Sequence, residues 1–209
     1  MNDLTNRPQI VLIGGTSHVG KSTLAKALAS KLNGKCIATD HLARHPGRPW
    51  STKENEIIKP HVAEHYRILS VPQLVEDVLI HYQKNVIPQV KNLIDTHNGD
   101  RCLIIEGSAL YPSLVKDLVG NKNVRGIWLV GNHSLLKKCI YANSNFDNAS
   151  RQERYLIYKF FQRTWMYESA MVNDLKRWEL EQNLVNCNLA IKQLVDKYLQ
   201  KLDISNDCL

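Results

Sequence analysis

Residues 14–23, GGTSHVGKST, decide the fold of this chain, and they follow the apolar run Gln9-Ile10-Val11-Leu12-Ile13. From Gly15 onward the stretch fits G-x-x-x-x-G-K-[ST], a loop whose backbone N–H groups surround the phosphates of a nucleotide. Glycines at its fixed positions permit the left-handed backbone angles and the close approach that such a loop needs. The residues expected to bind the nucleotide are Gly15, Thr16, Ser17, His18, Val19, Gly20, Lys21, Ser22 and Thr23.

Two side chains of this loop are suited to phosphate chemistry. Lys21 would bring a positive charge to the β- and γ-phosphates, and the Ser22 hydroxyl would ligate Mg²⁺. The helix expected after the loop would add the positive end of its dipole to the same site. We therefore expect ATP and Mg²⁺ as cofactors, with Lys21 as a catalytic residue and Ser22 as a metal ligand.

The sequence on both sides of the loop supports this interpretation, because the motif requires a strand before it and a helix after it. Val11-Leu12-Ile13 is typical of a buried strand. After the loop, Leu24, Leu28 and Leu32 recur on one face of a helix, and Gly34 suits the left-handed position that ends it.

The composition bounds the class of protein. The 209 residues, 44% apolar and 22% charged, are enough for one domain with a full hydrophobic core. No apolar run reaches the ~18–20 residues of a membrane span, and the N-terminus has no apolar leader. The five cysteines are odd in number and lack C-x-x-C spacing, which favours a cytoplasmic location. The net charge of +7 is spread along the chain, so it favours a phosphorylated ligand over nucleic acid.

Predicted strands alternate with predicted helices, which indicates an α/β domain with a parallel sheet. We expect strands over residues 9–13, 35–39, 102–105, 124–130 and 184–186. Helices are expected over 22–32, 62–69, 73–85 with a kink near Pro88 and a continuation to 98, 112–118, 133–141, 150–181 and 189–202. Ligands of such sheets bind beyond the carboxyl ends of the strands, where Asp40 and Glu106 both fall.

Three segments carry a resemblance to a known family: GGTSHVGKST, then ATDHLAR at 38–44, then LIIEG at 103–107. Together they resemble the small-molecule and nucleotide kinases among the P-loop proteins, such as shikimate, adenylate and adenylylsulfate kinases and chloramphenicol phosphotransferase. Through IIEG and the Tyr-Pro pair at 111–112 the chain is also similar to 2-phosphoglycerate kinase. The resemblance covers about the first 50 residues and residues 101–112.

The resemblance implies a three-layer P-loop fold with about five parallel strands in kinase-like order, flanked by helices. It implies a single domain over 1–209, with an acceptor-binding helical insertion at 40–98 and a lid region at 144–182. The implied activity is transfer of the γ-phosphoryl group of ATP to a small-molecule acceptor. A nucleotide-binding regulator that transfers nothing is the alternative.

The resemblance also implies roles for two acidic residues. Asp40 matches the acid that faces the acceptor hydroxyl, and it could orient that hydroxyl and take its proton. Capping of a helix that begins at His41 is the alternative role for Asp40. Glu106 takes the position of the acid that holds Mg²⁺, through water, if its strand lies beside that of the loop. Acceptor binding and a purely structural role both stay open for Glu106.

Arginines are expected to hold anionic groups. Arg44 and Arg48 correspond to arginines that bind anionic groups of the acceptor in related kinases, and guanidinium suits such groups. Near the start of the long helix, Arg154 is our first choice and Arg151 our second for a catalytic lid arginine over the transferring phosphoryl group. Arg163 lies nine residues beyond Arg154. For all of these, a solvated surface role is the alternative.

Two other motifs point elsewhere and are weak. His61-Val62-Ala63-Glu64-His65 matches the H-x-x-E-H pattern of some zinc proteases. Asp117-Leu118-Val119-Gly120 and Asn121-Lys122 resemble pieces of a GTPase signature, but Val124 stands where the acid that reads guanine would be. The prediction stays a kinase for a small, anionic acceptor.

Overall fold

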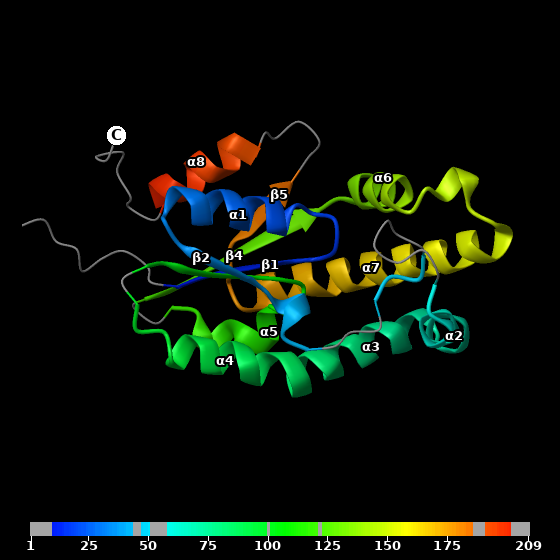
Figure 1. Ribbon diagram of the computed structural model, residues 1–209, viewed down its shortest axis with the longest axis horizontal. Coiled ribbons are helices and arrows are strands. Elements are labelled where there is room, and N and C mark those ends of the chain that lie inside the picture. The colour runs from blue at the N-terminus through cyan, green and yellow to red at the C-terminus, as the bar shows by residue number, and fades with distance from the viewer. Residues whose placement is uncertain are drawn as a thin grey trace, which may run out of the picture.

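Five parallel strands form one sheet in the order β2-β3-β1-β4-β5 (Figure 1). The computed structural model describes residues 10–43, 47–50, 58–99, 101–120, 123–185 and 191–201. This sheet confirms the predicted α/β class, and the strand before the phosphate-binding loop lies at its centre. The strands are β1 (Ile10–Gly15), β2 (Lys35–Ala38), β3 (Leu103–Glu106), β4 (Val124–Gly131) and β5 (Gln182–Val185).

Strand β1 is buried on both faces, which is why its sequence is continuously apolar. Val11 and Ile13 pack into one hydrophobic core, and Ile10 and Leu12 pack into the other. The sheet therefore separates two cores, and the loop after β1 leaves from the middle of the molecule.

Helices cover both faces of the sheet. Figure 1 shows α1 and α8 above it and α4 and α5 below it. In the described ranges no helix is both long enough and apolar enough to cross a bilayer. The helices are α1 (Lys21–Lys31), α2 (Pro60–Ile68), α3 (Val71–His81), α4 (Ile87–Asp95), α5 (Pro112–Val115), α6 (His133–Asn143), α7 (Arg151–Arg177) and α8 (Ile191–Lys201), with the short turns η2 (Thr39–His41), η4 (Lys116–Leu118) and η5 (Phe146–Asn148).

The helical segment between β2 and β3 differs from the expectation in one place. The kink expected near Pro88 is a π-helical turn, η3 (Tyr82–Val86), that joins α3 to α4. Proline has no N–H to donate, and its ring crowds the carbonyl one turn earlier, so the turn before it widens. The disturbance therefore lies on the N-terminal side of the proline.

Helix α7 connects the two cores. Ser150 and Glu153 form a capping box at its start, as the sequence predicts for Ser150. Leu156 and Phe160 pack into the first core, whereas Tyr167 and Met171 pack into the second. The middle of α7 therefore passes the carboxyl edge of the sheet, next to the loop after β1.

Candidate active site

The loop between β1 and α1 has the curled backbone that the motif predicts. Gly15 has φ +140° and Gly20 has φ +92°. A Cβ atom on Gly15 would lie 2.6 Å from the carbonyl oxygen of Leu129 in β4, so only glycine fits there. Residue His18 also has a left-handed backbone, with φ +70°.

Lys21 lies beneath this loop and is only 8% exposed. Its Nζ donates a hydrogen bond to the carbonyl oxygen of Thr16 at 2.7 Å. Burial lowers the pKa of the Lys21 ammonium, while the nearby carboxylates of Glu106 and Asp40 oppose that shift. The ammonium therefore points into the loop, where a phosphate oxygen could replace the carbonyl as its partner.

Ser22 and Glu106 form a pair of oxygen donors beside Lys21. The Ser22 hydroxyl donates a hydrogen bond to Glu106 Oε1 at 2.8 Å. The register of the sheet explains the pairing, because Glu106 lies opposite Ile13 at the end of β1. A hydroxyl and a carboxylate oxygen are the donor types that Mg²⁺ prefers, so this pair fits the ion that the sequence predicts.

A cleft of about 650 Å³ gathers most of the predicted site residues. Asp40, in η2 at the end of β2, lines it together with Arg48 and Glu106. The Arg48 guanidinium donates to Asn143 Oδ1 at 3.3 Å. The predicted acceptor ligand Arg44 lies outside the described residues. The loop residues that line the cleft are Ser17, His18, Gly20, Lys21, Ser22 and Thr23.

The His18 ring lies beside two aromatic side chains that pack against each other. The Trp50 ring centroid is 6.2 Å away, and that of Phe160 is 6.4 Å away. Burial, with the Arg48 charge next in size, lowers the pKa of His18 to about 4. The imidazole is therefore neutral at pH 7 and adds no charge to the loop.

The two predicted lid arginines lie at the surface. Arg154 donates hydrogen bonds to the backbone oxygens of Phe146 and Asp147, at 3.2 and 2.6 Å. Neither it nor Arg151 is among the residues that line the cleft. A catalytic role for either arginine stays a prediction, and for Arg154 it would require the side chain to leave these carbonyl groups.

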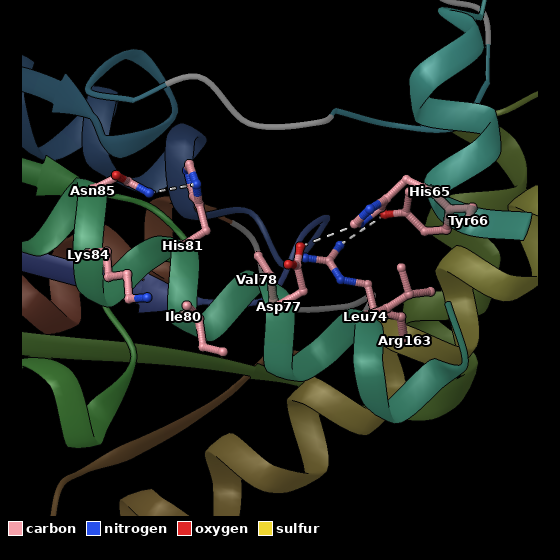
Figure 2. A pocket seen from close by; sticks show the side chains of 10 residues that line it. All are labelled: His65, Tyr66, Leu74, Asp77, Val78, Ile80, His81, Lys84, Asn85 and Arg163. Carbon is pink, nitrogen blue, oxygen red and sulfur yellow. Dashed lines mark hydrogen bonds and ion pairs between the residues drawn. The ribbon is translucent and has the colours of Figure 1, made fainter. Parts of the chain in front are cut away.

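Arg163 is the residue that the sequence interpretation underrated. It is 7% exposed and lines a pocket of about 230 Å³ between α2, α3 and α7, shown in Figure 2. Its guanidinium donates to the Tyr66 hydroxyl at 3.4 Å. Within the described part of the chain, no Asp or Glu forms an ion pair with it.

A pattern in the sequence could have identified Arg163. Together with Leu156, Phe160 and Tyr167 it recurs at the three- and four-residue spacing of one helix face. The other three residues are apolar or aromatic and buried. An arginine at such a position is costly unless it is paired, so it marks a candidate binding residue.

The H-x-x-E-H motif has a different environment. His65 Nε2 lies 3.7 Å from Asp77 Oδ2 of α3, and burial lowers the pKa of His65. In the ranges that the structure describes, His, Cys, Asp and Glu side chains form no group of three or more that could hold a metal ion. The motif lies on α2 and joins that helix to α3.

One curated protein resembles this chain in sequence. No family model matches the chain. A 2-phosphoglycerate kinase of Methanocaldococcus jannaschii is 32% identical over 207 residues, covering 94% of this chain and 63% of the relative. The chain thus spans less than two thirds of the length of that relative.

Two solved structures share the fold. A deoxyadenosine kinase from M. mycoides has a TM-score of 0.55 at 16% identity, covering 93% of this chain and 99% of the other. A gluconokinase from Sinorhizobium meliloti 1021 has a TM-score of 0.50 at 15% identity, covering 95% and 94%. These two structures confirm the fold class, and the similarity in sequence to a 2-phosphoglycerate kinase supports the resemblance to P-loop small-molecule and nucleotide kinases.

Proposed function

We propose that this chain is an ATP-dependent kinase that phosphorylates a hydroxyl group of a small anionic metabolite. The observation that carries the proposal is the convergence of Lys21, Asp40 and the Ser22–Glu106 pair on one cleft. Similarity to a 2-phosphoglycerate kinase makes 2-phosphoglycerate the first acceptor to test. That molecule has one free hydroxyl and two anionic groups.

The residues of the cleft match the requirements of phosphoryl transfer, which depends on positioning and on neutralising charge. The loop N–H groups and Lys21 would hold the phosphates, and Ser22 and Glu106 would hold Mg²⁺. When bound, that ion neutralises charge on the β- and γ-phosphates. Asp40 would accept the proton of the acceptor hydroxyl as its oxygen bonds to the γ-phosphorus and the bond from that phosphorus to ADP breaks.

The pocket beside Arg163 is our candidate for the acceptor site. Its volume of about 230 Å³ suits a small metabolite. Arg163 also lines a smaller cavity together with Thr16 and Ser17, so it lies between the pocket and the phosphate-binding loop. A buried guanidinium that forms an ion pair with no carboxylate of the described residues favours an anionic ligand, which it can bind through two parallel hydrogen bonds.

Arg163→Gln should raise the KM for the acceptor by about 10- to 100-fold, the loss expected when a charged hydrogen-bond donor is removed. The ATP dissociation constant should stay within about twofold, since Lys21 and the loop are unchanged. Steady-state kinetics and calorimetry with ATP would measure both quantities.

Two variants serve as controls for Arg163. Arg177→Gln removes an exposed charge at the C-terminal end of α7 and should change neither the KM for the acceptor nor the ATP dissociation constant. Arg154→Ala tests the lid prediction in parallel. A larger fall in kcat for Arg154→Ala than for Arg163→Gln would show that the arginine needed for transfer is Arg154, near the start of α7, and not Arg163.

The proposal itself is tested with purified full-length protein, Mg²⁺ and ATP. Candidate acceptors are 2-phosphoglycerate first, then gluconate and shikimate, with uncharged deoxyadenosine for comparison, and mass spectrometry would detect the gain of one phosphoryl group. If the protein binds ATP but phosphorylates neither these acceptors nor any compound of a metabolite extract, the result would favour the alternative function, a nucleotide-binding regulator.

A further inference from the structure

Glu168 of α7 is a buried carboxylate that the proposed reaction does not use. It is 1% exposed and lies under the start of the phosphate-binding loop. Its Oε1 accepts a hydrogen bond from the backbone N–H of Gly131, the last residue of β4. The last register pair between β1 and β4 joins Gly15 to Leu129, so the Gly131 N–H lies beyond β1 and Glu168 supplies its acceptor.

The second carboxyl oxygen of Glu168, Oε2, is buried without a hydrogen-bond partner in the described residues. The Thr16 side chain lies beside the carboxyl group and lowers its pKa, and Thr16 Oγ1 is buried too. The Thr16 hydroxyl could accept a hydrogen bond from a protonated Oε2 or donate one to an ionised Oε2, and burial makes the ionised form the more costly of the two.

Glu168 is linked to Lys21 through Thr16, because the Thr16 carbonyl oxygen accepts the hydrogen bond from Lys21 Nζ. The titratable groups that face Glu168 are Lys21 of α1 and Tyr167 of its own helix. Burial is the largest influence on the carboxyl group and raises its pKa to about 7. Near neutral pH the two protonation states are therefore similarly populated.

We infer that Glu168 is a positioning residue, which joins α7 to β4 beside Thr16 of the phosphate-binding loop, and that nucleotide binding is linked to a proton on its carboxyl group. The inference rests on the proposed nucleotide site but not on transfer to an acceptor. Phosphates bring negative charge close to Glu168, and they draw Lys21 away from Thr16. Both changes favour the protonated carboxyl, so binding should take up a proton.

The sign of the pH dependence follows from the same argument. Nucleotide binding raises the pKa of Glu168 above its value in the free protein, so affinity should fall as pH rises through neutrality. Each unit of that rise corresponds to about a tenfold loss of affinity across the range. Glu168→Gln keeps an acceptor for Gly131 and imitates the protonated form, so its affinity should vary much less with pH.

The experiment is calorimetric titration of the full-length protein with Mg²⁺ and the non-hydrolysable analogue AMP-PNP, at pH 7.5, in buffers of different ionisation enthalpy. Wild-type protein should take up about 0.3–0.5 more proton than Glu168→Gln. Protons that belong to the nucleotide cancel in this difference. Glu76→Gln, an exposed carboxylate of α3, should behave like the wild type.

A second measurement needs no nucleotide. The pKa of Glu168 in the folded protein lies above its ordinary value of 4.5, so the stability it contributes is present at low pH and is lost as pH rises through about 7. The wild-type Tm should therefore fall relative to Glu168→Gln between pH 6 and pH 8.

Equal proton uptake in the two proteins would overturn the inference and leave the kinase proposal intact. Proton uptake that depends on Glu168, without any phosphorylated product, would support the inference and count against the kinase. Failure of both proteins to bind AMP-PNP would overturn both proposals.

Discussion

Lys21→Met is expected to slow γ-phosphoryl transfer by about 10³-fold, the scale seen when a charge that stabilises the transition state is removed. The Lys21 ammonium is the buried cation that points into the loop, where its present partner is a backbone carbonyl. Methionine is also unbranched, is only one atom shorter and removes a poorly solvated charge, so the fold should be retained. Single-turnover transfer from ATP would measure the effect.

The matched control is Lys26→Met on the exposed face of the same helix, which should leave transfer unchanged. Circular dichroism and Tm would show that both variants are folded. Turnover of Lys21→Met within a few-fold of the wild type would remove Lys21 from the reaction and, with it, the main support for a kinase.

Asp40→Asn is expected to reduce transfer by about 10²-fold while leaving ATP affinity nearly unchanged. Asp40 lies in the cleft at the end of β2, on the same side as Glu106. Asparagine keeps the shape of the side chain but cannot take the proton of the hydroxyl. The measurement is kcat together with the ATP dissociation constant.

Asp117→Asn provides the control, since that side chain is 84% exposed. A parallel loss of ATP affinity in Asp40→Asn would show that Asp40 acts on the metal or on the loop instead. A kcat equal to that of the wild type would show that Asp40 has only a structural role in η2.

Most of the sheet could be predicted because β1, β3 and most of β4 are buried and read as apolar runs, and β2, although partly exposed, keeps the apolar pair Cys36-Ile37. The exception is β5, expected at 184–186 and found at Gln182–Val185. Its first residues are polar, and Asn183 is buried because Lys197 of α8 donates to its Oδ1. The partner belongs to the next helix, 14 residues along the chain, so the pattern within the strand does not reveal it.

Within the site, the sequence predicted the residues that belong to local motifs. Residues 15–23 are contiguous, and Asp40 and Glu106 follow predicted strands, so parallel strand geometry alone brings them together. The sequence did not identify Arg163 or Glu168 as site residues, because their partners are distant in the chain. The partner of Arg163 is Tyr66, 97 residues away. The partner of Glu168 is Gly131, 37 residues away. Both are charged residues on a buried face of α7, which is the general signal to search for.

The central place of β1 has a consequence for how the chain acquires its shape. Ile10 is in register with Leu103 on one side and with Val124 on the other, so its neighbours are synthesised about a hundred residues after it. Strand pairings of such long sequence separation form slowly. An apolar strand that is exposed before its partners are available is prone to aggregation. Ribosome-bound fragments that end before residue 124 should therefore lack affinity for ATP, and chaperones should recognise the stretch from Ile10 to Ile13 until β4 emerges.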